Sequence, residues 1–262
     1  MPALVAWHSR LLILHDVIVS LLCDYIDKQG EVYPMDRALE MRERLEQQVL
    51  VGAGDVELEG DLVIPAAAQS LIVFVHGSGS SRHSPRNKLV ARFLNEAGLG
   101  TLLFDLLTER EEAQDVYTAK WRFDIGHLAG RVIAATEWLA QDKRTEGLKI
   151  GYFGASTGAA AALVAAARLP ELVGAVVSRG GRADLAESNL AIVKAPTLLI
   201  VGGNDTQVLP LNNEALELLN CEKELSIVVG ATHLFEEPGK LEQVAELTGD
   251  WFRKHLPVHR AN

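Results

Sequence analysis

A serine between two glycines is the first group in this chain that could do chemistry, in the run Gly154-Ala155-Ser156-Thr157-Gly158. An apolar segment, 150–153, precedes it and an alanine-rich segment, 159–162, follows it. This order predicts a strand, a tight turn and a helix, with Ser156 exposed at the apex of the turn and at the positive end of the helix dipole. Both glycines would be required, because side chains there would collide with neighbouring elements. The short pattern alone also fits a glycine-rich connector with an N-capping serine.

Asp205 and His233 could complete a catalytic triad with this serine. Each follows an apolar segment, 197–201 and 225–229. A serine hydroxyl is a weak nucleophile at neutral pH, so a histidine must take its proton and an aspartate must fix the histidine tautomer. The chain order serine, aspartate, histidine is the order of the triad in α/β-hydrolase folds. The alternatives are a turn aspartate and a surface-loop histidine.

The oxyanion of an acyl-transfer reaction would need two preorganised donors, each worth about 3 kcal/mol when removed. We expect them to be the backbone N–H groups of Thr157 and of Ser78, which lies in the glycine-rich loop after the apolar segment 71–75. His76 would hold this loop. Such a loop could also cradle a phosphate, but Arg82 stands where a dinucleotide fingerprint has its third glycine, and the Walker pattern is missing.

Strands and helices alternate about five times after an opening antiparallel hairpin. This alternation predicts an α/β fold with a mostly parallel, doubly wound sheet, whose ligands bind at the carboxyl ends of the strands. The predicted strands are 49–51, 56–64, 71–75, 101–106, the segment before Ser156, 173–177, 197–201 and 225–229, and the predicted helices are 85–97, 124–142, the segment from the elbow to 169, 211–219 and 240–255.

Four arginines, Arg82, Arg86, Arg179 and Arg182, follow two of the predicted strands. In an acidic protein, guanidinium groups at the rim of the active site suggest a substrate that carries a carboxylate or phosphate. They could equally form ion pairs with acidic residues in the predicted loop after the fourth strand, Glu109, Glu111, Glu112 and Asp115.

The segment 178–196 is too short to hold the helical lid that many lipases insert at this point. We therefore expect no lid domain and an open, shallow site that suits small soluble esters.

Residues 49–256 resemble the dienelactone hydrolase family of α/β hydrolases. The resemblance implies this fold, a hydrolytic activity and the triad Ser156, Asp205 and His233. It is strongest with a bacterial subgroup found near, or fused to, phosphoribosyltransferase domains, although no phosphoribosyltransferase signature is present. The family's namesake has a cysteine nucleophile where this chain has serine, so the substrate need not be a dienelactone. The matching segments are 76–87, 122–125, 154–158, 203–205 and 230–233.

Composition sets further limits on function. The 262 residues are 48% hydrophobic and 23% charged, which is typical of a globular domain. The net charge of −10 argues against nucleic acid or an anionic membrane as a partner. Cys23 and Cys221, the two cysteines, suggest a reducing, cytoplasmic location. No metal-ligand spacing is present, and we expect neither a metal nor a cofactor.

We predict a hydrolase domain over 44–262 and an N-terminal extension, 1–43. The apolar run 11–23 is too short to span a membrane and lacks a signal-peptide cleavage site. It could be an amphipathic helix that packs or dimerises, or translation could begin at Met35 or Met41. Residues 36–48 suggest a short exposed helix or a leader.

The sequence thus predicts a serine hydrolase that cleaves a small ester, lactone or thioester through an acyl-enzyme. A non-catalytic binding module with this fold and a small peptidase of prolyl oligopeptidase type are the alternatives. The oligomeric state stays open.

Overall fold

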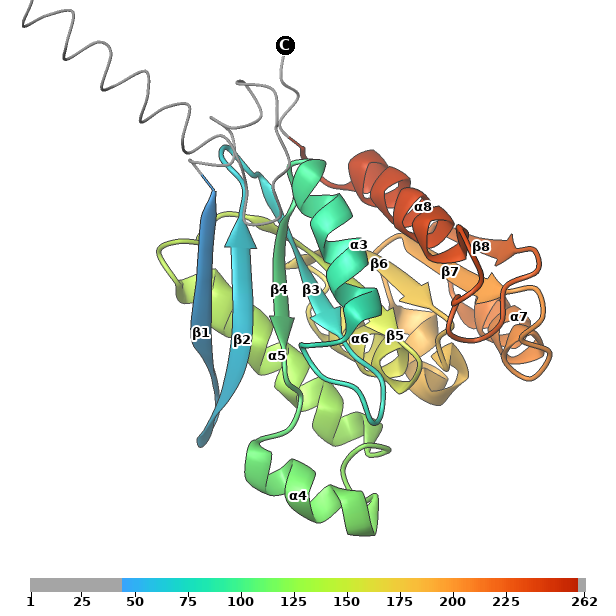
Figure 1. Ribbon diagram of the computed structural model, residues 1–262, viewed down its shortest axis with the longest axis horizontal. Coiled ribbons are helices and arrows are strands. Elements are labelled where there is room, and N and C mark those ends of the chain that lie inside the picture. The colour runs from blue at the N-terminus through green and yellow to red at the C-terminus, as the bar shows by residue number, and fades with distance from the viewer. Residues whose placement is uncertain (1–43, 259–262) are drawn as a thin grey trace, which may run out of the picture. The chain divides into compact units, whose positions relative to one another are not determined.

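The computed structural model of the chain describes residues 44–258, so the expectations for 1–43 lie outside it. One eight-stranded sheet forms the centre, in the order β1-β2-β4-β3-β5-β6-β7-β8 (Figure 1). β2 is antiparallel to both of its neighbours and all other neighbouring strands are parallel. The strands are β1 (Leu45–Ala53), β2 (Val56–Ile64), β3 (Ser70–Val75), β4 (Gly100–Phe104), β5 (Lys149–Ala155), β6 (Val173–Arg179), β7 (Thr197–Gly202) and β8 (Lys223–Val228).

Helices cover both faces of the sheet, which confirms the predicted α/β class. α3 and α8 pack over one apolar face, and α5 and α6 pack over the other together with η1 and α7 (Figure 1). The helices are α3 (Pro85–Glu96), α4 (Glu109–Thr118), α5 (Ile125–Gln141), α6 (Thr157–Arg168), the 3₁₀ helix η1 (Ala183–Ile192), α7 (Val208–Leu218) and α8 (Lys240–His255).

Burial explains why the central strands were predictable. Every residue of β3, β4 and β7 is buried, as a strand covered on both faces requires, and each of these strands is a nearly continuous apolar run. The second half of β1 alternates instead, with Val49, Val51 and Ala53 buried and the residues between them exposed. The outer face of this hairpin is therefore open to solvent.

Two predictions about local structure are wrong. Residues 45–48, expected in a helix or leader, form the first half of β1, because Leu45 to Gln48 pair with Ile64 to Asp61 of β2. Three of those four residues are polar and exposed, so no alternation marks the strand. The acidic segment expected as a loop is helix α4, which a capping box between Thr108 and Glu111 begins.

The connection from β6 to β7, residues 180–196, holds η1, which packs against α6 and α7 with Ala183, Ala186 and Leu190 buried. As predicted, no lid domain is inserted there. Between residues 44 and 258, none of the helices has both the length and the apolarity that a membrane crossing needs.

Candidate active site

Ser156 lies in a strained turn between β5 and α6. Its backbone has φ 51° and ψ −125°, a region that non-glycine residues rarely adopt. A Cβ on Gly154 would overlap the backbone of Ala159, and a Cβ on Gly158 would overlap the carbonyl oxygens of Val75 and His76. The Ser156 side chain makes no capping hydrogen bond to α6, so the simple N-cap alternative does not describe it.

Asp205 and His233 form a hydrogen-bonded pair beyond β7 and β8. Nδ1 of His233 lies 2.6 Å from Oδ2 of Asp205, whose side chain is only 8% exposed. A carboxylate at Nδ1 favours the tautomer that carries its proton there, which leaves Nε2 able to accept a proton. Asn204 joins the two loops, because its backbone N–H donates to Ala231 O and its side chain donates to Gly230 O.

The segment after β6 brings the serine and histidine loops together. The N–H of Ser156 donates to Arg179 O at 3.4 Å, and the N–H of Arg182 donates to Ser156 O at 3.0 Å. Between them, a Cβ on Gly180 would lie 3.0 Å from His233 O and 3.5 Å from its Nδ1. Residues 179–182 therefore contact both loops, and only glycine allows the close approach at position 180.

The predicted oxyanion loop approaches the serine closely. A Cβ on Gly77 would lie 2.8 Å from the Cβ of Ser156. The N–H of Ser78, one of the two expected donors, donates to Oγ1 of Thr157 at 2.9 Å. The loop is thus joined to the first residue of α6 by the Ser78 N–H, the same group that we expect to donate a hydrogen bond to a substrate oxygen.

His76 holds this loop, as we expected. Its ring is buried, with Nδ1 3.0 Å from Gly77 O and Nε2 accepting the N–H of Leu106 at 3.2 Å. Burial lowers the pKa of His76, which keeps the ring neutral. A neutral ring can donate through Nδ1 and accept through Nε2, as both contacts require.

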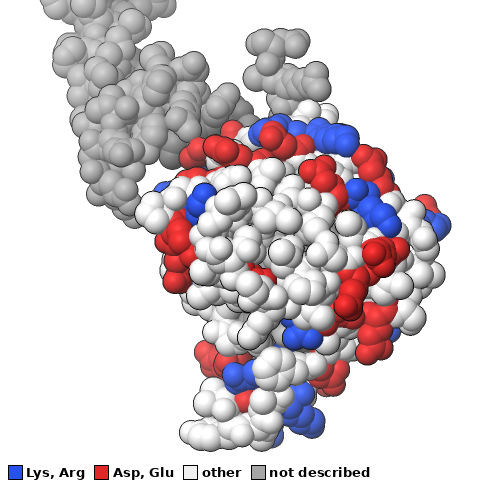
Figure 2. All heavy atoms as spheres, turned by 90° about the vertical axis from the view of Figure 1, so that its right-hand side faces the viewer, with Lys and Arg blue, Asp and Glu red and all other residues white. Residues whose placement is uncertain are grey.

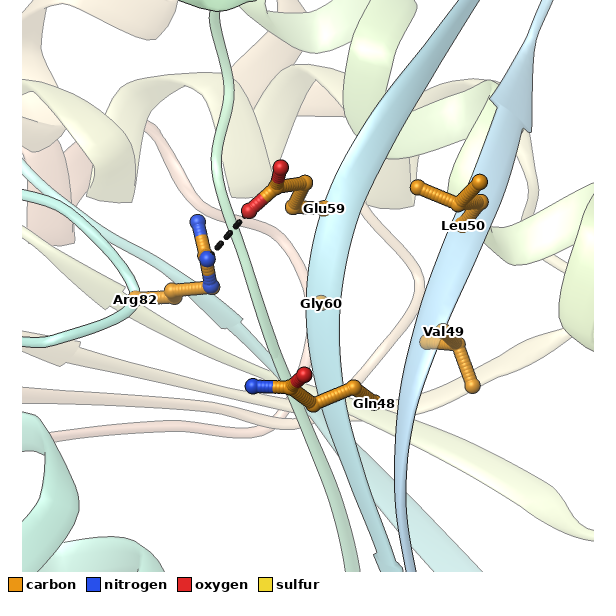
Figure 3. Close-up of a pocket in the computed structure, with 6 residues that line it drawn as sticks. All are labelled: Gln48, Val49, Leu50, Glu59, Gly60 and Arg82. Carbon is orange, nitrogen blue, oxygen red and sulfur yellow. Dashed lines mark hydrogen bonds and ion pairs between the residues drawn. The ribbon is translucent and has the colours of Figure 1, made fainter.

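Arg82 and Arg182 are occupied by carboxylates. Arg82 forms ion pairs with Asp105 and with Glu59, and Figure 3 shows its side chain extending from its loop toward Glu59 on β2. There it lines a cavity of about 250 Å³ on the outer face of the hairpin, with Gln48, Val49, Leu50 and Gly60. Arg182 binds Asp184 with both Nε and Nη2, at 2.9 and 2.8 Å.

These partners differ from the ones that the sequence suggested. Glu111 pairs with Arg131, and Asp115 with Arg122. Arg86 binds Glu236, which is 150 positions away in the chain. Arg179 is buried at the end of β6 and forms no carboxylate pair with any described residue.

Two residues at this site were not predicted from the sequence. Asn87, in the first turn of α3, accepts a hydrogen bond from Arg179, and Phe235 packs under the same guanidinium. The position of Phe235, two residues after His233, was the available clue. Within residues 44–258, no cluster of three His, Cys, Asp or Glu side chains is arranged to hold a metal ion.

A serine on a strained strand-to-helix turn, a histidine–aspartate pair from later loops and this sheet order are features of the α/β-hydrolase fold. Residues 58–256 match the Dienelactone hydrolase family. The chain belongs to this family, as the resemblance predicted.

Several solved structures are similar to this chain. The crystal structure of a dienelactone hydrolase from Anabaena variabilis is 57% identical with a TM-score of 0.81, over 82% of this chain and 100% of that chain. Est1E from Butyrivibrio proteoclasticus is 15% identical with a TM-score of 0.66, over 79% of this chain and 98% of its own. The esterase Pf2001 from Pyrococcus furiosus is 18% identical with a TM-score of 0.67, over 87% of this chain and 98% of its own. The last two show the fold alone.

A curated relative from Mycobacterium tuberculosis (strain H37Rv) carries the name "Putative phosphoribosyl transferase Rv0571c". It is 56% identical over 211 residues, which are 80% of this chain and 47% of that protein. The chain therefore spans about half the length of the curated relatives it matches.

Proposed function

We propose that this chain is a serine hydrolase that cleaves a small carboxylic ester, lactone or thioester through an acyl-enzyme. One combined observation carries the proposal. Ser156 has a strained backbone and a side chain that makes no capping hydrogen bond, and His233 Nδ1 lies 2.6 Å from Asp205 Oδ2. The similarity to the dienelactone hydrolase from Anabaena variabilis supports an ester or lactone as substrate.

In the proposed reaction, Nε2 of His233 takes the proton of Ser156 as its Oγ attacks the carbonyl carbon. The negative charge then develops on the carbonyl oxygen, which the N–H groups of Thr157 and Ser78 would receive. The Ser78 N–H would have to turn from Thr157 Oγ1 toward this oxygen. The imidazolium of His233, stabilised by Asp205, then protonates the leaving group.

Deacylation repeats these steps with water. His233 takes a proton from the water as it attacks the acyl-enzyme, and the second tetrahedral intermediate collapses with return of the proton to Ser156. The products are the carboxylic acid and an alcohol or thiol, or a single hydroxy acid from a lactone, so atoms balance without a cofactor.

The proposal is tested with a fluorophosphonate probe and a panel of 4-nitrophenyl esters, lactones and thioesters. We expect the probe to label Ser156, and Ser156→Ala to lower kcat at least about 10³-fold while leaving the thermal unfolding temperature within a few degrees. Ser226→Ala, on the edge strand β8, is the matched serine control and should keep wild-type kcat.

Each alternative predicts a different result. A binding module would not be labelled and would turn over none of the panel. A peptidase of prolyl oligopeptidase type would be labelled and would cleave peptides faster than esters. Retained activity in Ser156→Ala would exclude the serine mechanism.

We further propose a cytoplasmic location, which the low cysteine content supports. Cell fractionation with a tagged full-length chain tests it, and recovery in a secreted fraction would contradict it.

A further inference from the structure

Arg179 lies beside the proposed nucleophile on the face of the sheet that α3 and α8 cover. In the register between β5 and β6 it is opposite Ala155, the residue before Ser156. Ala175 and Val177 belong to the apolar cluster under α3 and α8, and the two-residue period of a strand puts Arg179 on that same face. Its Nη2 lies 3.4 Å from Oδ1 of Asn87.

The positive charge there is not compensated. Arg179 is 7% exposed, no described carboxylate lies within ion-pair distance, and its Nε has no hydrogen-bond partner. Burial, together with the nearby charge of Arg86, lowers the pKa of Arg179 to about 10, so Arg179 stays protonated at neutral pH. Nε of Arg86 is also buried without a partner, and its one carboxylate, Glu236, is 63% exposed.

This arrangement is unusual for the chain. An unpaired buried guanidinium is costly, and proteins normally pair it. Other arginines of the described residues each form an ion pair with an acidic side chain: Arg82, Arg122, Arg131, Arg144 and Arg182.

Residues around Arg179 place its guanidinium group close to the loop of His233. Phe235 packs under the Arg179 guanidinium, 5.9 Å from ring centre to the guanidinium carbon, and follows His233 by two residues. Its φ of 57° is strained for an aromatic residue, and strain of this kind gathers at functional sites. Gly180, next in the chain, contacts His233 itself. A group bound at Arg179 would therefore lie against the histidine loop.

We propose that Arg179 and Arg86, with Asn87, form a subsite for a carboxylate or phosphate group on the substrate. The subsite rests on the proposed hydrolase function and narrows its substrate class to anionic esters, lactones or thioesters. The substrate anion would accept hydrogen bonds from the unpartnered Nε groups and would compete with Glu236 for Arg86.

Two glutarate esters test this subsite: mono-4-nitrophenyl glutarate, whose distal carboxylate is free, and methyl 4-nitrophenyl glutarate, in which a methyl ester removes that charge. We expect kcat/KM for the anionic ester to exceed that for the neutral one about tenfold or more, and Arg179→Met to remove most of this ratio. Arg144→Met, whose side chain is paired with Asp142 away from the proposed site, is the matched control and should keep the wild-type ratio. A purely structural arginine would lower both values together, so an unchanged ratio in Arg179→Met would overturn the proposal.

Measuring anion binding directly distinguishes a carboxylate site from a phosphate site. It also distinguishes failure of the subsite proposal from failure of the hydrolase proposal. Titration calorimetry of Ser156→Ala with glutarate and with inorganic phosphate, at constant ionic strength, should show binding of one or both that Arg179→Met abolishes. Tighter glutarate binding identifies a carboxylate site, tighter phosphate binding a phosphate site, and binding of neither contradicts the subsite. If the protein binds one of these anions but the wild type hydrolyses none of the esters, the result contradicts the hydrolase proposal alone. If Arg179→Met does not fold, Arg86→Met serves the same comparison.

Discussion

At the scale of single residues, the buried His76 shows how one neutral ring shapes the proposed oxyanion loop. Its two ring nitrogens contact the loop at Gly77 and the chain after β4 at Leu106. Protonation would put a second hydrogen where Leu106 N–H now donates, and it would place a charge in a buried position. Both effects favour the neutral ring, in agreement with the direction of its pKa shift.

This shift predicts how stability depends on pH. Because the pKa of His76 is lower in the folded state than its unfolded value of 6.5, the unfolded chain binds the extra proton first as the pH falls. The stability that the neutral ring supports is complete above pH 6.5 and is lost below it. Between pH 7.5 and 5.5, we expect wild type to lose about 1 kcal/mol more unfolding free energy than His76→Gln.

Urea unfolding at the two pH values measures this difference. The substitution will lower stability at both values, so only the change with pH is informative. Equal losses in wild type and in His76→Gln would contradict the neutral, buried state of the ring.

At the scale of elements, the elbow depends on how closely β5, β3 and α6 approach one another. Small side chains along α6 are all buried from Ala159 to Ala162, which lets the helix lie close to the sheet. Gly158 is the tightest point, where a Cβ would overlap two carbonyl oxygens that belong to the chain leaving β3. Backbone atoms in a central strand cannot move aside as a flexible side chain can.

Gly158→Ala should therefore destabilise the protein by about 3 kcal/mol or more, or prevent folding. Gly130→Ala is the matched control, because Gly130 lies on the exposed side of α5 and a Cβ added there would have nothing within 4 Å. At this position we expect a gain of about 0.5–1 kcal/mol from helix propensity. Chemical denaturation of both variants gives the comparison, and similar effects at the two sites would contradict the close packing of the elbow.

At the scale of the whole molecule, the chain carries an excess of negative charge. Figure 2 shows one face, at the end of the molecule that carries β8 and α7, where charged side chains of both signs surround a largely uncharged central area. Against the net charge of −10, Arg179, which has no carboxylate partner among the described residues, is a local exception beside the proposed site.

The missing lid predicts a preference for short acyl chains. Burial of each methylene contributes about 0.8 kcal/mol only where the protein covers it, and the connection of residues 180–196 supplies no covering domain. We expect kcat/KM to be at least about tenfold higher for 4-nitrophenyl acetate or butyrate than for the dodecanoate, measured below the micelle concentration. A steady rise of kcat/KM with chain length would point to a covered acyl pocket.

Much of this architecture could be predicted from local patterns. The continuous apolar runs identified the buried strands, and the spacing of Gly154, Ser156 and Gly158 identified the elbow. α4 could have been predicted as well, because Thr108 and Glu111 have the capping-box spacing. The first half of β1 could not, since its polar residues become a strand only through pairing with β2.

The sequence by itself determined the sheet, the elbow and the order of the proposed triad, because hydrophobic periodicity and turn chemistry act between near neighbours. Tertiary structure alone decided which arginines are neutralised. Arg82 pairs with Asp105, 23 positions away, and Arg86 with Glu236, while Arg179 is left without a carboxylate among the described residues. Charge pairing depends on which loops meet in space, and that is fixed only when the carboxyl ends of the strands come together.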